Sequence, residues 1–250
     1  MAIPTGFGGR DYPDFGVSGL KTSKVVISDM SELAVRMGAI NRFDRLGSVL
    51  FQGAFEHGLV NWNQNAYPAG AYAVPSGRYF SIVPHSALMA TTTALNSYSG
   101  LNMSLPIPYV SAMGFEFHVK VMDDIDNFRC SFNLYTGSYR YWVEVRIDTI
   151  ANEIDFYNEA GGFTVISTDD IYFGLASPFH IIKIVADLVN ENYVRLVVDG
   201  IDYNLRAYKL NKAVSTTTPR LYCLFINMPL TASVQRVCLD NVIITMDEPT

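Results

Sequence analysis

Three carboxylates lie close together in one short segment of this 250-residue chain, at Glu153, Asp155 and Glu159. Two carboxyl groups that flank a glycosidic bond can hydrolyse it, at about 5–5.5 Å apart in retaining enzymes and about 6.5–9.5 Å in inverting ones. On a regular strand Glu153 and Glu159 would lie about 20 Å apart, which is too far. Glu153 and Asp155 have a workable separation, but both would be ordinary outward residues of a sheet, so the segment does not indicate catalysis.

The four histidines are the other side chains that could support catalysis, and each is isolated: His57, His85, His118 and His180. None has a second histidine at the spacing of metal ligands on a helix. The sequence also has no Gly-x-Ser-x-Gly nucleophile elbow and no phosphate-binding loop. A triad is recognised in space, so a missing motif is no proof. With a structural role as the default for each histidine, we predict that the protein is not an enzyme.

Aromatic and charged side chains gather on one side of three expected strands. The segments 128–135, 140–147 and 153–157 alternate apolar and polar residues, so each has one face toward a core and one face outward. If the strands are neighbours, the outward face brings together the candidate binding residues Tyr135, Arg140, Trp142, Glu144 and Tyr157. Such side chains are shared by sugar-binding platforms and protein interfaces. A solvated face with cross-strand ion pairs, a protein interface and a glycan-binding surface all remain open.

Further strands are expected throughout the second half of the chain, at 179–188, 193–198, 201–206, 220–227 and 234–245. Turn residues separate them, and Asp199-Gly200 is a strong hairpin signal. Many short strands at this spacing are typical of a sandwich or barrel and exclude alternating strand–helix units. We predict an all-β protein built from an antiparallel sandwich.

Two other segments carry little charge. Segment 61–75 contains Trp62, Tyr67 and Tyr72. It is either an aromatic rim for a glycan or a core tryptophan followed by a packed loop, and we expect Trp62 in the core. Segment 86–111 is rich in small uncharged residues, which in an acidic protein suggests contact with another subunit.

Composition excludes several classes of protein. Hydrophobic residues make up 49% and charged residues 17% of the chain, so it is not disordered. A net charge of -6 argues against nucleic acid as a partner. The chain has three cysteines, Cys130, Cys223 and Cys238, and this odd number at wide spacing fits buried thiols better than disulfides or a metal site. No apolar run reaches the about 20 residues of a membrane span, and the first nine residues lack a signal-peptide pattern.

The first 47 residues differ from the rest. Residues 1–27 are rich in glycine and proline and read as an extended arm, which would lie against its own body or a neighbouring subunit. Asp29 and Glu32 have capping-box spacing, and the apolar residues that follow predict one short helix over 29–37. We therefore divide the chain into an arm and short helix at 1–47, which anchor an assembly, and a sandwich at 48–250.

Three segments resemble a known group of domains: FEHGLVNW (55–62), the strand pair at 180–200, and VCLDNVII (237–244). They are similar to jelly-roll carbohydrate-binding modules and to laminin-G or concanavalin-like domains. The resemblance covers about 48–250 and implies a concanavalin-like jelly roll.

The same resemblance implies a metal site. In these relatives a structural calcium often links the first and last strands, and the matching residues are Glu56 and Asp240. Hard oxygen ligands suit Ca²⁺. The alternative is that Glu56 caps a turn and that Asp240 binds backbone amides.

The segment FDRLGSV (43–49), which follows the short helix, resembles the leader of a group of bacteriophage and prophage virion proteins. That resemblance implies a non-enzymatic structural protein, a capsid decoration or tail component. Its partners would be copies of itself and other virion proteins, and it would be assembled in the host cytoplasm. The alternative function is a carbohydrate-binding module or lectin-like adhesin that recognises a glycan on the aromatic sheet face.

Overall fold

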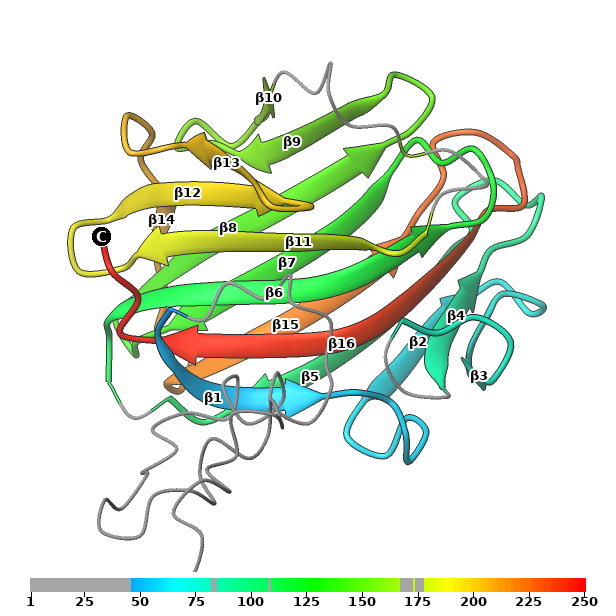
Figure 1. Cartoon of the computed structure of the whole chain (residues 1–250), viewed down its shortest axis with the longest axis horizontal. Coiled ribbons are helices and arrows are strands. Elements are labelled where there is room, and N and C mark those ends of the chain that lie inside the picture. Colours follow the sequence, from blue (N-terminus) through cyan, green and yellow to red (C-terminus); the bar gives the residue numbers. More distant parts are fainter. Residues whose placement is uncertain (1–45, 82–84, 108, 167–172, 174–177) are drawn as a thin grey trace, which may run out of the picture.

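The computed structural model describes residues 46–81, 85–107, 109–166, 173 and 178–250, and these form two antiparallel sheets packed face to face (Figure 1). Every helix or strand within that part of the chain is a β-strand, which confirms the predicted all-β sandwich. The arm at 1–27 and the helix at 29–37 lie outside the described residues. No helix among the described residues is long and apolar enough to cross a membrane.

The first sheet, called sheet I, has the strand order β13-β12-β11-β6-β16-β4-β3, and β1 also pairs with β16. Its strands, in this order, are Ile201–Asn204, Asn192–Val198, His180–Asp187, Ala112–Val121, Arg236–Met246, Ser86–Ala90, Tyr72–Ser76 and, for β1, Ser48–Gly53. The last strand of the chain therefore lies in the middle of the sheet.

The second sheet, called sheet II, has the order β10-β9-β8-β7-β15-β5-β2, and β14 pairs with β8. Its strands are Phe163–Ile166, Glu153–Tyr157, Tyr139–Asp148, Phe128–Tyr135, Arg220–Asn227, Tyr98–Leu105, Asn63–Tyr67 and, for β14, Asn211–Val214. The predicted strands at 128–135, 140–147 and 153–157 are neighbours here, as β7, β8 and β9.

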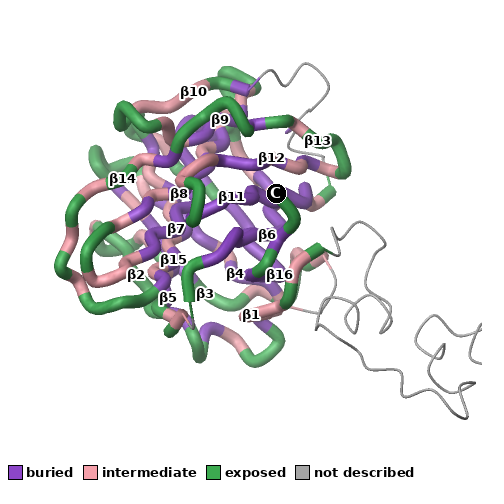
Figure 2. The backbone as a smooth tube through the Cα atoms, turned by 90° about the vertical axis from the view of Figure 1, so that its left-hand side faces the viewer, coloured by how far each residue is buried: buried purple, intermediate pink, exposed green. Residues whose placement is uncertain are grey.

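Aromatic rings join the two sheets in the core. Phe115 of sheet I stacks on Phe132 of sheet II with ring centroids 4.1 Å apart. Phe225 meets the edges of Phe117 and Trp62 at 5.6 and 5.7 Å. Trp62 is only 7% exposed, which confirms its expected place in the core. Figure 2 shows buried residues concentrated in the strands and exposed ones in the connections.

Turn chemistry sets the register of the hairpin between β12 and β13. Asp199 and Gly200 both have positive φ, 51° and 89°, as a two-residue primed turn requires. The predicted hairpin is therefore confirmed, with Val198 opposite Ile201.

Much of the uncharged segment 86–111 belongs to two strands of the sandwich. It forms β4 and β5, whose Ala87, Met89, Leu101 and Met103 side chains lie in the core. The apolar side chains of these two strands are therefore buried within the sandwich, and the expected contact of this segment with another subunit stays a prediction.

Candidate functional site

The five binding residues expected from the sequence lie on one face. On β7, β8 and β9 the alternate side chains enter the core, so the residues between them point outward from sheet II. Tyr135 of β7 lies opposite Arg140 of β8. Phe156 of β9 lies opposite Val145 of β8, so the next residues along these strands, Tyr157 and Glu144, are also neighbours.

We call this outer face the platform. It consists of the outward side chains of β9, β8, β7 and β15: Asp155, Tyr157, Arg140, Trp142, Glu144, Arg146, Arg129, Ser131, Asn133, Tyr135, Arg220, Tyr222, Leu224 and Ile226.

Trp142 is the best-fixed aromatic residue of the platform. Its Nε1 donates to Ser131 Oγ at 2.8 Å and to Glu144 Oε2 at 2.7 Å. The Arg140 guanidinium lies 4.5 Å from the centroid of the indole, and the Tyr157 ring centroid is 4.6 Å away. The indole is half-buried and held by neighbours on three strands, so it is preorganised.

Glu144 is a buried acid on an outer face, only 2% exposed. Burial raises the pKa of its carboxyl, and hydrogen bonds from Ser131 and Trp142 partly offset that effect. Arg129, whose Nη1 lies 3.9 Å from Glu144 Oε1, lowers the pKa further but does not reverse the direction. Glu144 therefore retains a proton to higher pH than an exposed glutamate does.

Asp155 is a second buried carboxylate, and Arg146 holds it through Nε at 2.5 Å and through Nη2. Burial raises the pKa of Asp155 despite the opposing effect of Arg146. Arg146 lies opposite Asp155 in the register, so Asp155 and Glu144 are diagonal neighbours about 7–8 Å apart at the backbone. Glu153 lies opposite Asp148 at the end of the pairing, outside this cluster.

A residue of the opposite sheet supports the platform from below. Tyr193 of β12 is fully buried, and its hydroxyl donates to the Tyr157 backbone carbonyl at 2.7 Å. Its ring meets Phe156 edge-on at 5.1 Å. The sequence pattern alone did not reveal this contact, because it joins strands of different sheets.

The two residues proposed for calcium have separate partners. Asp240 is buried on β16, where Oδ2 accepts from Ser81 N at 2.7 Å and Oδ1 from Asn241 N at 2.8 Å. Glu56 lies in the exposed turn after β1, with Oε1 3.8 Å from His57 Nε2. Among the described residues no group of three or more His, Cys, Asp or Glu side chains could hold a metal ion. The calcium site stays a prediction.

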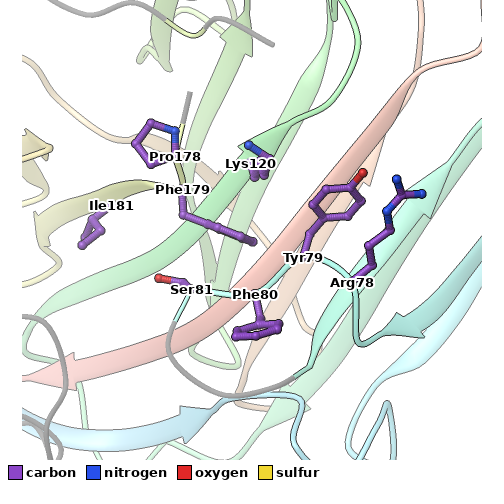
Figure 3. Close-up of a pocket in the computed structure, with 8 residues that line it drawn as sticks. All are labelled: Arg78, Tyr79, Phe80, Ser81, Lys120, Pro178, Phe179 and Ile181. Carbon is purple, nitrogen blue, oxygen red and sulfur yellow. The ribbon is translucent and has the colours of Figure 1, made fainter. Parts of the chain in front are cut away.

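A pocket of about 490 Å³ lies on the outer face of sheet I, over β6 and β11 (Figure 3). Its lining combines rings with two cations: Arg78, Tyr79, Phe80, Ser81, Lys120, Pro178, Phe179 and Ile181. Figure 3 shows the 78–81 segment passing over the strands toward Lys120 and Phe179.

Below this pocket, Ser81 Oγ lies 2.9 Å from His118 Nδ1, and His118 Nε2 lies 3.8 Å from Glu116 Oε1. A hydroxyl, an imidazole and a carboxylate in this order have the connectivity of a nucleophile and its base. Acyl transfer also needs donors for an oxyanion. The Ser81 amide, a candidate for that donor, already donates to Asp240 Oδ2 at 2.7 Å. The platform is therefore the stronger candidate.

Comparison with known proteins identifies the fold but no family. No family model matches the sequence, and no curated protein matches it. Solved structures do match. They include the cellulose-induced protein Cip1, with a TM-score of 0.53 and 9% identity, over 78% of this chain and 96% of that one. An endo-β-1,4-glucuronan lyase from the fungus Trichoderma reesei has a TM-score of 0.52 and 11% identity, over 80% of this chain and 96% of that one.

An endo-β-1,3-glucanase from Pyrococcus furiosus gives a TM-score of 0.51 and 13% identity, over 83% of this chain and 98% of that one. The chain is a concanavalin-like jelly roll. This confirms the fold that the sequence resemblance implied.

The expectation of a non-enzymatic protein is overturned by these neighbours. Two of the three are enzymes by their descriptions, a lyase and a glucanase. The absence of sequence motifs is no evidence against an enzyme, because catalytic groups that come from several strands leave no local signature. None of the three structures is described as a virion protein.

Proposed function

We propose that this chain is a carbohydrate-active β-sandwich that binds a polysaccharide on the platform. The observation that carries the proposal is the fixed Trp142 indole, whose hydrogen bonds and ring contacts preorganise it among polar groups. Sugar sites combine an aromatic surface with a few well-placed polar groups. The glucuronan lyase and glucanase with the same fold support this class of ligand by analogy at the level of the fold.

The platform also extends far enough for a chain of sugars. In the register, Tyr157, Glu144, Ser131 and Leu224 lie in one row across four strands, and Asn102 and Asn63 continue it on β5 and β2. Five strand spacings correspond to about 24 Å. The amides of the two asparagines are exposed or half-buried and provide donors and acceptors at this end.

The test is affinity for soluble polysaccharides, measured by affinity electrophoresis and calorimetry with Trp142 variants. Trp142→Ala should weaken binding by about 2 kcal/mol, or about 30-fold, as expected for a central aromatic contact. Trp142→Phe keeps a ring but loses the Nε1 donor, so its affinity should lie between those of the wild type and Trp142→Ala. Tyr72→Ala, an exposed aromatic of sheet I, is the matched control. Equal affinity for Trp142→Ala and the wild type would exclude the platform.

Cleavage of the bound polysaccharide is the second candidate function, favoured by the two buried carboxyls. Glu144, with its raised pKa, would donate a proton to the leaving oxygen, and Asp155 would act as the second carboxylate. Because Glu144 is 2% exposed, the side chains around it must move when substrate binds. Glu144→Gln should abolish release of reducing ends while leaving binding intact, and Glu153→Gln is the control. Absence of any product from the wild-type protein contradicts this candidate.

The virion role, its assembly in the host cytoplasm, the homo-oligomer and the calcium ion also remain proposals. A virion component that binds a glycan would combine both functions predicted from the sequence. Solution mass of the full chain against a variant lacking residues 1–47 tests the assembly role: a defined oligomer that becomes a monomer on truncation supports it, and identical monomers contradict it.

A further inference from the structure

The four arginines of the platform fall into two pairs with different partners. Arg129 and Arg146 each face a buried carboxylate, Glu144 and Asp155 respectively. Arg140 and Arg220 each lie over an aromatic ring, and no carboxylate among the described residues pairs with either. In a protein with net charge -6, the described residues therefore supply no counter-ion for two guanidinium groups at one end of this face.

The register places these two arginines on either side of one tyrosine. Tyr135 of β7 lies opposite Arg140 of β8 and opposite Arg220 of β15. The two arginines are thus two strand spacings apart, about 9.6 Å at the backbone. Asn133 and Tyr222 form the next position along the same strands, beside Trp142.

Aromatic rings hold both guanidinium groups in place. The Arg140 guanidinium lies 4.5 Å from the Trp142 ring centroid, and the Arg220 guanidinium 5.5 Å from that of Tyr135. Such stacking orients the planar group while leaving its edge donors available. Binding of an anion there loses less side-chain conformational entropy than binding to flexible arginines would.

Arg140 also carries a polar atom with no acceptor. Its Nε is buried and makes no hydrogen bond to any described residue. A buried donor without a partner is unfavourable, so a ligand oxygen that reaches Nε when the surrounding side chains move would recover that lost free energy. This is the second, independent indication that a ligand belongs at this end of the platform.

We infer that Arg140 and Arg220 bind the anionic groups of an acidic polysaccharide, while the ring of Tyr135 between them contacts a sugar. The inference rests on the proposed function and specifies its ligand class. A uronic-acid carboxylate and a sulfate ester each present two anionic oxygens on one atom, which a guanidinium can bind with two hydrogen bonds. Asn133 and Tyr222 would hydrogen-bond the neighbouring hydroxyl groups.

The experiment measures dissociation constants for four soluble polymers: polyglucuronate, the same polymer after carboxyl reduction, dextran sulfate and dextran. The variants are Arg140→Gln, Arg220→Gln and their double mutant. Arg206→Gln is the matched control, because it removes the same charge from an exposed side chain in the turn after β13 of sheet I. Arg140→Lys and Arg220→Lys keep the charge but lose the two-point geometry.

Polyglucuronate should bind, and each Arg→Gln change should weaken it about tenfold, in line with a hydrogen bond to a charged group. The Lys variants should recover only part of the affinity, Arg206→Gln should bind as the wild type does, and carboxyl reduction should remove most of the binding. Binding of dextran sulfate but not polyglucuronate, with the same dependence on both arginines, supports the inference and assigns sulfate as the source of the anion.

Two outcomes overturn the inference separately from the proposed function. If the neutral polymers bind as tightly as the acidic ones, and Trp142→Ala weakens their binding but the arginine variants do not, the platform binds glycans without selecting for their charge. If Arg206→Gln weakens the acidic polymers as much as Arg140→Gln does, their binding is non-specific attraction and the arginine pair is not a site. Failure of all four polymers to bind contradicts the proposed function itself.

Discussion

Removal of a single hydroxyl group tests whether sheet I supports the platform. Tyr193→Phe deletes the O–H that donates to the Tyr157 carbonyl at 2.7 Å and keeps the ring that meets Phe156. The lost hydrogen bond, with the Tyr157 carbonyl left without this donor, should cost about 1–2 kcal/mol of unfolding free energy. For a chain of this size that corresponds to a fall in Tm of about 2–8 °C.

Urea denaturation followed by fluorescence and by circular dichroism gives the free energy, with Tyr208→Phe as the control. Tyr208 packs on the same Phe156 ring at 4.8 Å but is 41% exposed, so loss of its hydroxyl should change stability by less than about 0.5 kcal/mol. Tyr193→Ala, which also removes the ring, should cost about 3–5 kcal/mol. The reasoning is refuted if Tyr193→Phe is as stable as the wild type, or as unstable as Tyr193→Ala.

Other predictions concern the core, the buried charges and the thiols. Phe225→Ala should lose about 3–5 kcal/mol in urea denaturation, because its ring contacts aromatics of both sheets. Glu248→Gln should lose about 3–5 kcal/mol, since it leaves the buried Lys183 ammonium without the carboxylate 2.7 Å away; a loss under 1 kcal/mol would contradict this. Folding raises the pKa of Glu144, so the stability that its protonated carboxyl contributes is fully present below the unfolded pKa and is lost as the pH rises through the folded pKa. Glu144→Gln should therefore reduce the fall in unfolding free energy above about pH 4.5, measured by denaturation across pH. Burial raises the pKa of Cys238 to about 11 and that of Cys130 and Cys223 as well, so the folded protein should resist a thiol reagent at pH 8 that labels all three after unfolding.

The sequence predicted the strands whose two faces differ in polarity. In β7 and β8 every second residue is apolar and enters the core, so both the strand boundaries and the outward set with Trp142 could be deduced. The primed turn at Asp199-Gly200 was predictable because its conformation depends on local residues alone. The burial of β4 and β5 was harder to predict, because Met89, Leu101 and Met103 enter the core from an uncharged segment whose other residues are mostly small and give little contrast between the two faces.

The chemistry of the site was harder to deduce than its location. Burial of Glu144 and Asp155 depends on side chains that come from neighbouring strands, such as Arg129 and Trp142, and a single strand shows nothing of this. The outward position of a carboxylate suggested solvent contact, whereas the structure closes both acids off. The contact from Tyr193 to Tyr157 crosses the sandwich, so no pattern along the chain predicts it.

The position of β16 sets the order in which the two sheets can be completed during synthesis. All seven strands of the main path of sheet II, and β14, precede residue 228, whereas sheet I needs Arg236–Met246 to join β6 to β4 and to receive β1. Ser48 of β1 pairs with Met246 of β16, so β1 cannot join the sheet until β16 has been synthesised. Contacts this distant in sequence slow folding and leave unpaired strand edges exposed to other chains. During synthesis all strands of sheet II therefore emerge before β16, and the core that the two sheets share stays open until β16 completes sheet I.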